Sequence, residues 1–152
     1  MIIGILSDTH GRVSSQVLNG LKGVEAILHA GDVGGSDVIE MLQRIAPVTA
    51  VRGNTDNNNW SKTLPMTEMV MLATKTFYIL HDLYTLDLNP SAAGIDIVVH
   101  GHTHQTSIKT SGNILYFNPG SASVRRHGAP LSIGRVTIEN NTVKPEIIEL
   151  KH

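Results

Sequence analysis

The sequence contains no cysteine, which limits both its covalent chemistry and its metal chemistry. Without cysteine there is no disulfide framework and no thiolate ligand. Any bound metal must therefore be held by imidazole, carboxylate, amide or water. A structural zinc knuckle is not expected, because such sites depend on cysteine sulfur.

An excess of charge of one sign and a long apolar run are also missing. The formal net charge is −1, with lysine and arginine scattered along the chain. This distribution predicts no concentrated positive surface that would bind long nucleic acid or an anionic membrane. The apolar start, Met1 to Leu6, has no basic lead-in and stops at Ser7 and Asp8, so it is too short for a signal peptide or membrane span. We therefore expect a cytoplasmic protein with a small substrate.

The length and apolar content predict one globular unit. A chain of 152 residues with 41% hydrophobic residues can bury a core without disulfides or structural metals. The sequence shows no internal repeat, linker or low-complexity tract. We expect a single domain over residues 1–152.

The first half of the chain alternates short apolar runs with segments of helical spacing. The expected elements are strands at residues 2–6, 26–29 and 48–51, a helix at 14–21, and a second helix that Ser36 would cap and that reaches Ile45. This order predicts a parallel sheet with right-handed crossovers. Ligands gather at the carboxyl ends of the strands in such sheets, and Asp8, Asp32 and Asn54 follow the three strands.

The second half is dominated by strand signals. Expected strands lie at residues 66–72, 76–80, 95–99, 107–110, 115–117, 133–138 and 143–150. Thr74-Lys75 and Asn140-Asn141 are the expected turns. Residues 84–94 read as a weak helix or loop, since Pro90 prevents a long helix. The methionines at positions 66, 69 and 71 suit core or interface filling, and apolar residues around Trp60 or Met69 leave a homo-oligomer open.

Aspartate, asparagine and histidine residues recur beside glycines where the apolar runs end. They are Asp8 and His10, Asp32 after Gly31, Asn54 after Gly53, His81, and the segment Gly101-His102-Thr103-His104. An Asp or Asn beside glycine is by default a turn or cap residue, so each of these motifs is weak alone. Together they deliver hard oxygen and imidazole donors, which suit first-row divalent metals. The set indicates a hydrolase with two metal ions.

The order and spacing of these motifs resemble those of the calcineurin-like metallophosphoesterase superfamily, especially its small single-domain prokaryotic phosphodiesterases. The resemblance rests on Asp8-Thr9-His10, Gly31-Asp32, Gly53-Asn54-Thr55-Asp56, Gly101-His102-Thr103-His104 and Asn118-Pro119-Gly120-Ser121. It spans essentially the whole chain. It implies an α/β fold of the four-layer αββα sandwich type, with a dinuclear site where two sheets meet.

The resemblance also implies a ligand set for the two metal ions. Asp8, His10 and His104 would hold the first ion, Asp32 would bridge, and Asn54, His81 and His102 would complete the second. Ions roughly 3.5–4 Å apart would clamp a phosphodiester and lower the pKa of a bridging water, which yields the attacking hydroxide. Catalysis would then depend on Asp8, Asp32, Asn54 and His81 through the metals. Manganese is favoured, with iron, cobalt, nickel or zinc as alternatives.

The substrate contacts are less well defined by the sequence. Besides Asn54, the cluster Arg125-Arg126-His127 has the chemistry to grip a phosphate, since guanidinium matches its oxygens. The same cluster is equally consistent with a solvated face. Because a dianionic monoester calls for a denser basic pocket, we expect a small phosphodiester substrate.

Two positions depart from the superfamily pattern. Thr55 stands where many members carry a histidine thought to protonate the leaving group, so good leaving groups should be preferred. Asp56 is an alternative donor, although an exposed carboxyl is ionised near neutral pH. Asp82 follows His81 where a glycine is usual, which makes the placement of His81 less secure. His29 and His100 suit packing or the orientation of a ligand.

Two other function classes fit parts of the sequence. One is a protein-binding scaffold that reuses this fold with little or no catalysis. The complete ligand set argues against it, because a scaffold has no need to concentrate ionisable groups. The other is a nuclease acting on long DNA or RNA, which would call for a capping domain or a basic groove, and neither is visible.

Overall fold

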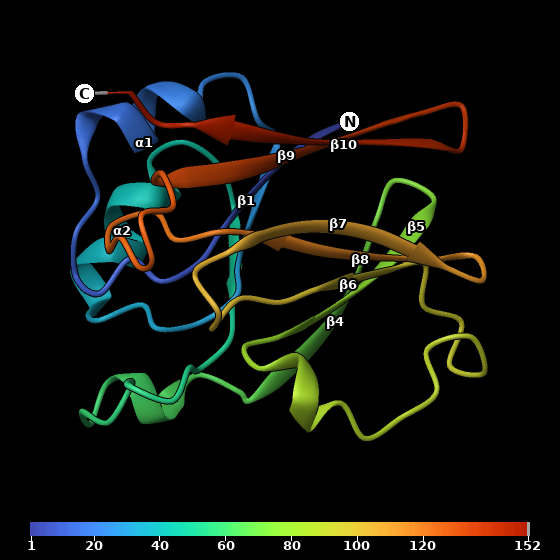
Figure 1. Ribbon diagram of the computed structural model, residues 1–152, viewed down its shortest axis with the longest axis horizontal. Helices are drawn as coiled ribbons and strands as arrows, with labels where there is room; N and C mark the ends of the chain where they lie inside the picture. Colours follow the sequence, from blue (N-terminus) through green and yellow to red (C-terminus); the bar gives the residue numbers. More distant parts are fainter. Residues whose placement is uncertain (152) are drawn as a thin grey trace.

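The computed structural model describes residues 1–151, and His152, to which the sequence assigns no role, lies outside them. Two five-stranded sheets pack face to face, and the helices α1 and α2 lie at one side (Figure 1). The elements in chain order are β1 (Ile2–Leu6), α1 (Ser15–Gly20), β2 (Ala26–His29), α2 (Ser36–Gln43), β3 (Val48–Ala50), the 3-10 turn η1 (Ser61–Thr63), β4 (Thr67–Leu72), β5 (Lys75–Leu80), the 3-10 turn η2 (Leu83–Thr85), β6 (Ile97–Val99), β7 (Thr106–Ser111), β8 (Ile114–Pro119), β9 (Ser132–Glu139) and β10 (Thr142–Glu149).

Both sheets are mixed, and each has a parallel centre. The first sheet has the order β10-β9-β1-β2-β3, in which β1, β2 and β3 are parallel. The second has the order β4-β5-β6-β8-β7, in which β5, β6 and β8 are parallel. The remaining strands pair antiparallel at the edges. The predicted α/β sandwich and the parallel sheet of the first half are thus confirmed.

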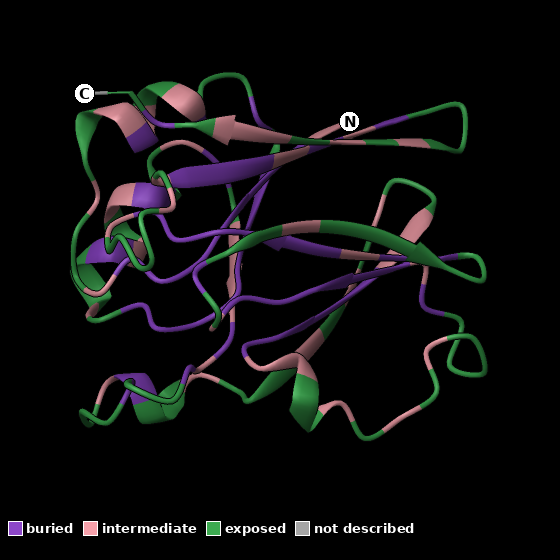
Figure 2. Cartoon of the chain, in the orientation of Figure 1, coloured by how far each residue is buried: buried purple, intermediate pink, exposed green. Residues whose placement is uncertain are grey.

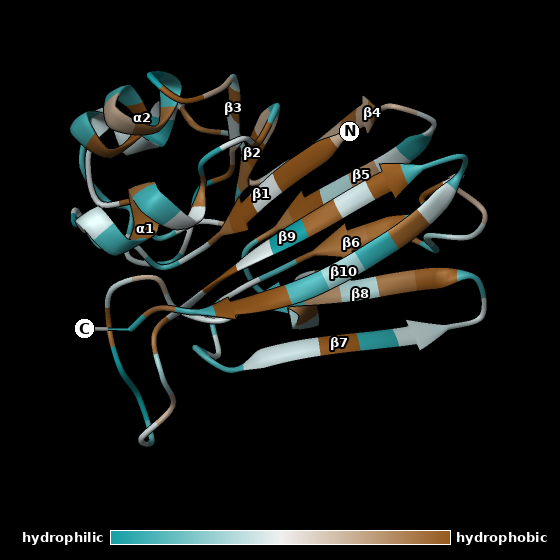
Figure 3. Cartoon of the chain, turned by 90° about the horizontal axis from the view of Figure 1, so that it is seen from above, coloured by the Kyte–Doolittle hydropathy of each residue, from teal (hydrophilic) through white to brown (hydrophobic). Residues whose placement is uncertain are grey.

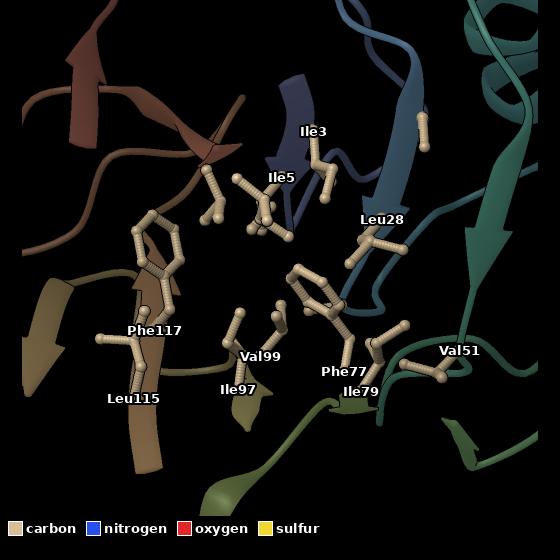
Figure 4. Close-up of a cluster of buried hydrophobic side chains, with 14 residues drawn as sticks. Ile3, Ile5, Leu28, Val51, Phe77, Ile79, Ile97, Val99, Leu115 and Phe117 are labelled. Atoms are coloured by element: carbon tan, nitrogen blue, oxygen red, sulfur yellow. The ribbon is translucent and has the colours of Figure 1, made fainter. Parts of the chain in front are cut away.

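The layer between the sheets is the larger apolar core. Alternate residues of the central strands point into it, including Ile5 of β1, Phe77 of β5 and Phe117 of β8. Figure 4 shows both rings directed toward the strands of the first sheet. Because these strands are buried on both faces, their sequences read as continuous apolar runs. This core joins the two sheets to each other.

The outer face of the first sheet is covered by helices, as the apolar spacing predicts. Val17 and Leu21 in the α1 region and Val38 and Leu42 of α2 pack on this face with Ile27 of β2. The hydroxyl of Ser14 accepts a hydrogen bond from the Val17 N–H and so caps α1. The expected cap of α2 is wrong. Gly35 precedes that helix, and Ser36 is its first residue.

The outer face of the second sheet has a thinner cover. The 3-10 turn η2 and the following loop pack Leu83, Leu86 and Leu88 against a small cluster that contains Tyr78 and Val98. The edge strands β4 and β7 are largely exposed (Figure 2). Part of this face is therefore open to solvent.

Two expectations for the second half need correction, and a third is confirmed. Met66, Met69 and Met71 are exposed on and beside the edge strand β4, so they do not fill the core. The turn between β4 and β5 is at Ala73-Thr74, because Lys75 already belongs to β5. The hairpin turn at Asn140-Asn141 is confirmed, and both residues have the positive φ that such turns need.

Within residues 1–151, no helix has the length and apolarity that a membrane crossing requires.

Removal of a ring from the layer between the sheets should destabilise the protein strongly. Phe117→Ala is expected to lower the free energy of unfolding by about 3–5 kcal/mol, because it leaves a cavity in a fully buried core. Met71→Ala, at an exposed position, should change it by less than about 0.5 kcal/mol. Urea unfolding of both variants measures the two values. Similar losses in the two variants would contradict the placement of the core.

Candidate metal centre

The candidate ligands follow the carboxyl ends of parallel strands in both sheets. Strands β1, β5 and β6 run toward the same edge of the molecule in Figure 3. Asp8 and His10 follow β1, Asp32 follows β2, Asn54 follows β3, His81 follows β5, and His102 and His104 follow β6. The stacking of the two sheets therefore brings together residues that are up to 96 positions apart, from Asp8 to His104. The sequence-predicted ligands converge at this edge.

The Asp8 carboxylate lies at the centre of the site and is fully buried. Its Oδ1 is 3.2 Å from His104 Nε2 and 3.8 Å from His10 Nε2. Its Oδ2 accepts hydrogen bonds from the Ser7 hydroxyl at 2.7 Å and from the His102 N–H at 3.3 Å. One oxygen is thus held by the protein, and the other faces the imidazoles.

Asp32 lies between His10 and His81. Its Oδ2 is 3.8 Å from His10 Nε2 and 3.3 Å from His81 Nε2. Its Oδ1 accepts a hydrogen bond from the Thr55 N–H at 2.9 Å. Asp8, His10 and His104 form one group with metal-binding geometry, and Asp8, Asp32 and His81 form another. Asp8 belongs to both groups, while Asp32 Oδ2 faces a histidine of each.

Asn54 and His102 complete the other side of the site. Asn54 Oδ1 is 2.9 Å from His81 Nε2 and 3.1 Å from His102 Nδ1. The rings of His81 and His102 meet edge to face with their centroids 5.1 Å apart. The His102 side chain is 39% exposed, so this side of the site is open to solvent.

Backbone carbonyls orient two of the imidazoles. The Nδ1–H of His81 donates to the Ala30 carbonyl at 2.7 Å, and the Nδ1–H of His104 donates to the Val124 carbonyl at 3.2 Å. In each ring this leaves Nε2 directed toward the carboxylates. Such outer hydrogen bonds fix the tautomer and orientation of metal-binding histidines.

Two atoms of the site have unused bonding capacity. Asp8 Oδ1 and His10 Nε2 are buried, and neither has a hydrogen-bond partner among residues 1–151. Their separation of 3.8 Å is too long for a hydrogen bond. A cation between them would satisfy both. The residues present therefore fit a divalent metal, which prefers oxygen and imidazole donors of this kind.

The pKa values of the site follow from burial and from the facing charges. Burial raises the pKa of Asp32, but His81 and the Thr55 N–H outweigh it, so the pKa is lowered overall. The pKa of Asp8 is lowered in the same way, by His10 and Ser7 against burial. Asp8 raises the pKa of His10, and Asp32 raises that of His81 against the effect of burial. Both carboxylates are thus ionised at neutral pH, and a bound metal would displace protons from these histidines.

The backbone at the site adopts a conformation that is uncommon for residues with side chains. Asp8, His10, Asp32, His102 and His104 have φ between 46° and 74°. Most of the candidate ligands therefore lie in the left-handed region, which costs about 1 kcal/mol or more per residue. Such strain clusters at functional sites, and no feature of the sequence predicted it.

The motif glycines allow close approach of the chain to the ligands. A Cβ atom at Gly53 would collide with the Asp32 carboxylate, and one at Gly101 would collide with the Ser7 hydroxyl. These glycines are needed for space beside the ligands. The sequence identified their positions but not this reason.

Side chains behind the ligands hold the loops in place. His29 is fully buried, accepts a hydrogen bond at Nδ1 from the Gly31 N–H, and donates from Nε2 to Thr9 Oγ1 at 2.9 Å. The Asn118 amide donates to the Gly101 carbonyl and to Thr103 Oγ1, both at 3.1 Å. His29 and the Asn118 motif therefore support the two His-bearing turns without belonging to the ligand set.

The departures at Thr55 and Asp56 have a structural explanation. Thr55 is exposed, and its N–H supports Asp32. Asp56 is buried, in contrast to the exposed carboxyl assumed from sequence. Its two oxygens accept N–H groups of Val33, Gly34 and Gly53 at 2.9–3.2 Å. Asp56 thus ties the loops after β2 and β3 together, which leaves it poorly suited to act as a proton donor.

Asp82 does not disturb His81. Its φ is −112°, a value that any residue adopts, so a glycine is not required here. The carboxylate caps η2 by accepting the Tyr84 N–H at 3.1 Å. The other oxygen lies 3.9 Å from His102 Nε2.

The basic cluster lies on the loop between β8 and β9. Arg125, Arg126 and His127 are exposed. Burial lowers the pKa of His104, Asp8 opposes this effect, and the positive charge of Arg126 adds to it. Among the described residues, no hydrogen bond, ion pair or effect on a ligand pKa joins Arg125 or His127 to the candidate ligands.

Sequence reasoning missed several supporting residues. Ser7 holds Asp8, and Ser123 Oγ bonds to the carbonyl oxygens of Asp8 and Thr9 at 2.8 and 2.6 Å. Arg52 lines a pocket together with Asn54 and His81. Adjacency to the motifs was the only available signal for Ser7 and Arg52, and the sequence carried no comparable signal for Ser123.

This sheet arrangement and ligand cluster define the chain as a candidate metal-dependent phosphoesterase, and comparison with known proteins agrees. The family model of the calcineurin-like phosphoesterase superfamily domain matches residues 1–141. The probable metallophosphoesterase of Methanothermobacter thermautotrophicus is 31% identical over 160 residues, which cover 97% of this chain and 92% of that protein. Phosphodiesterase MJ0936 of Methanocaldococcus jannaschii is 27% identical over 168 residues, which cover 98% and 100%.

Solved structures show the same fold. The structure of YfcE, a phosphoesterase from E. coli, matches with a TM-score of 0.70 at 26% identity and covers 99% of this chain and 100% of that one. Vps29 of Entamoeba histolytica in complex with zinc matches with a TM-score of 0.74 at 23% identity and covers 98% and 99%, which supports the fold alone. The chain belongs to the calcineurin-like phosphoesterase superfamily, in its small prokaryotic branch, and is a metal-dependent phosphoesterase.

Replacement of His10 should reveal the backbone strain at the site. In metal-free protein, His10→Gly is expected to be more stable than His10→Ala by about 0.5–1 kcal/mol, because only glycine relieves a φ of 46° without cost. The difference is measured by urea unfolding of the two variants. Equal stability would show that the left-handed backbone at His10 is not strained.

The buried His29 should make stability depend on pH. Burial lowers the pKa of His29 to about 4 from its ordinary value of 6.5. Between these values the unfolded chain binds a proton that the folded chain does not. The contribution of His29 to the free energy of unfolding should therefore fall by up to about 1.4 kcal/mol per pH unit as pH drops from 6.5 toward 4, and this contribution should not depend on pH above 6.5.

Urea unfolding of metal-free wild type and of His29→Gln across this range separates the contribution of His29 from those of the other histidines. The gap between the two curves should narrow as pH falls. Parallel curves would contradict a neutral, buried imidazole at His29.

Proposed function

We propose that this chain hydrolyses phosphodiester bonds of small molecules with two divalent metal ions bound at the candidate metal centre. The observation that carries the proposal is the pair of unsatisfied buried atoms, Asp8 Oδ1 and His10 Nε2, within two groups of residues that share Asp8. Relatives named as phosphodiesterases support the reaction type.

The proposed ligand set is the one that the resemblance to the superfamily implies. Asp8, His10 and His104 would hold one ion, Asn54, His81 and His102 the other, and Asp32 would lie between them. When bound, the two ions would activate a water for in-line attack and neutralise charge on the phosphate. Manganese remains the favoured metal, with iron, cobalt, nickel or zinc as alternatives, because mixed oxygen and imidazole ligation suits all of them.

The protein's own groups prepare the site for this chemistry. The Ala30 and Val124 carbonyls hold His81 and His104 with Nε2 directed inward. The Thr55 N–H and the Ser7 hydroxyl hold Asp32 and Asp8 in place and, together with His81 and His10, lower the pKa values of these carboxyl groups. These contacts organise the ligands before a metal arrives, so little reorganisation is needed on binding.

The charges around the site favour a diester. Asn54 and the half-exposed His102 lie on the open side, where a phosphate would enter. The nearby cations are few. Arg126 lowers the pKa of His104 through its charge, and Arg125 and His127 belong to the same exposed loop. A monoanionic diester needs fewer cations than a dianionic monoester.

Neither Thr55 nor Asp56 is well suited to protonate the leaving group. Thr55 has no acidic proton in the neutral range. Asp56 is occupied by three backbone N–H groups. We therefore expect the enzyme to prefer activated leaving groups such as aryl oxides.

A scaffold without catalysis is the alternative, and the ligand set speaks against it. Burial of two ionised carboxylates is costly unless they are paired or bind a metal. A surface that only binds protein gains nothing from this arrangement.

Metal analysis combined with an aryl phosphodiester assay tests the proposal. The purified protein dialysed against Mn²⁺ should hold about two ions per chain and should hydrolyse methyl 4-nitrophenyl phosphate. Asp32→Ala should lose bound metal and reduce kcat/KM by about three orders of magnitude, because several kcal/mol of charge stabilisation are lost.

Glu146→Ala is the matched control, since it removes an exposed carboxylate from β10, outside the ligand set. It should retain both the metal and the activity of the wild type. A metal-loaded wild type that is inert on the diester would favour the scaffold. Full activity of Asp32→Ala would remove the assigned role of that residue.

A further inference from the structure

A cleft of about 690 Å³ lies on the outer face of the second sheet, beside the metal centre. Its floor is formed by β7, β8 and the segment that follows β6, and η2 with the preceding Asp82 forms one wall. The residues used below are Asp82, Tyr84, His100, Ser107, Lys109 and Tyr116. The volume is within the range of small-molecule sites, about 300–1,000 Å³. The thin cover of this sheet face leaves the cleft open.

The cleft begins next to the candidate ligands. Gly101 and Thr103, which line it, alternate along the chain with His102 and His104. Asp82 also lines the cleft, and its carboxylate is 3.9 Å from His102 Nε2. A molecule held at the metal centre by its phosphate could therefore extend over this edge of the sheet into the cleft.

The walls offer flat aromatic surfaces. The chain has only three tyrosines, and two of them, Tyr84 and Tyr116, line the cleft. Tyr84 is 96% exposed, so its ring has almost no packing partner within residues 1–151. Flat amphipathic rings on a cleft wall are suited to stack against a planar group.

The floor contains a buried polar atom without a partner. His100 is 7% exposed, and its Nδ1 makes no hydrogen bond to any of the described residues. A buried nitrogen of this kind calls for a hydrogen-bond partner. Across β7 and β8, Lys109 lies opposite Tyr116 and supplies a cationic donor at the same level of the cleft. The cleft thus combines stacking surfaces with both an imidazole nitrogen and an ammonium group.

We propose that this cleft binds the nucleoside part of a nucleotide phosphodiester whose phosphate lies at the metal centre. The inference rests on the proposed function and extends it to a substrate class. A nucleobase is a planar ring that carries both N–H donors and acceptors, which match the tyrosines, His100 and Lys109. His100 and the tyrosines are then specificity-determining residues, because they contact the group attached to the phosphate and not the reacting atoms.

Two esters with the same leaving group test the proposal on the manganese-loaded full chain. They are thymidine 5′-(4-nitrophenyl) phosphate and methyl 4-nitrophenyl phosphate. The wild type should have a KM for the thymidine ester about tenfold or more below that for the methyl ester. Ser107→Trp, which fills the cleft from a partly exposed position, should raise the KM for the thymidine ester about tenfold. The kinetic constants for the methyl ester should not change.

His100→Phe keeps the volume of the ring and removes its nitrogens, and it should have the same selective effect. Because His100 is buried, Ser107→Trp is the variant that keeps the test independent of folding. Ser15→Trp on α1 is the matched control, since it adds the same side chain outside the cleft. It should behave as the wild type on both esters. Equal KM values of the wild type for the two esters, or equal effects of Ser107→Trp on both, would overturn the proposal.

A direct binding measurement separates this proposal from the proposed function. Saturation-transfer NMR with thymidine 5′-monophosphate needs no turnover, and its signal should be present for the wild type and lost for Ser107→Trp. If the methyl ester is not hydrolysed but this pattern holds, the diesterase function fails and the nucleoside cleft stands. If binding is absent, or is unchanged in Ser107→Trp, the cleft proposal fails whatever the activity.

Discussion

The buried carboxylate of Asp8 is the interaction around which the site is organised. One of its oxygens is held by Ser7 and by the backbone of His102, and the other faces His10 and His104. An ionised group at this depth is costly without partners of opposite charge. The surrounding imidazoles lower that cost only in part, because Asp8 Oδ1 and His10 Nε2 find no hydrogen bond within the described chain. The fold thereby creates a strong preference for a cation.

The rest of the molecule keeps that arrangement in place. The apolar layer between the sheets sets the separation of the strand ends, and Asp56 and Asn118 fasten the loops that carry the ligands. Several ligands occupy left-handed backbone conformations, which are unfavourable for side-chain-bearing residues. Packing and loop hydrogen bonds have to overcome this cost before any metal binds. The stability of the core therefore offsets the backbone strain at the site.

The two outer faces of the sandwich differ in a way that bears on function. Helices cover the first sheet, whereas the second is covered by η2 and a loop. The exposed part of the second sheet adjoins the metal centre through Asp82 and the segment after β6. A substrate can thus meet both the ligands and a shaped surface at one edge. The methionines of the β4 region lie in solvent, on or beside an edge strand that pairs only with β5.

Local sequence was sufficient for most of the elements and for the positions of the candidate ligands. Apolar runs such as that of β1 indicate strands buried on both faces. Asp, Asn and His residues beside glycines indicate the ends of these strands. Patterns of this kind depend only on neighbours in the chain. They could not show that Asp56 is buried beneath three N–H groups, that Asp82 leaves His81 undisturbed, or that Met66, Met69 and Met71 are exposed.

The sequence by itself thus determined the parallel strands, the positions of the turns at their ends and the donors placed there, because each follows from side-chain spacing and turn chemistry. Only the tertiary structure decided which donors face one another, that Asp8 is shared, and that a cleft opens beside them. Those features depend on how the two sheets stack. Stacking is fixed by the fit of residues distant in sequence, such as Ile5 of β1, Phe77 of β5 and Phe117 of β8.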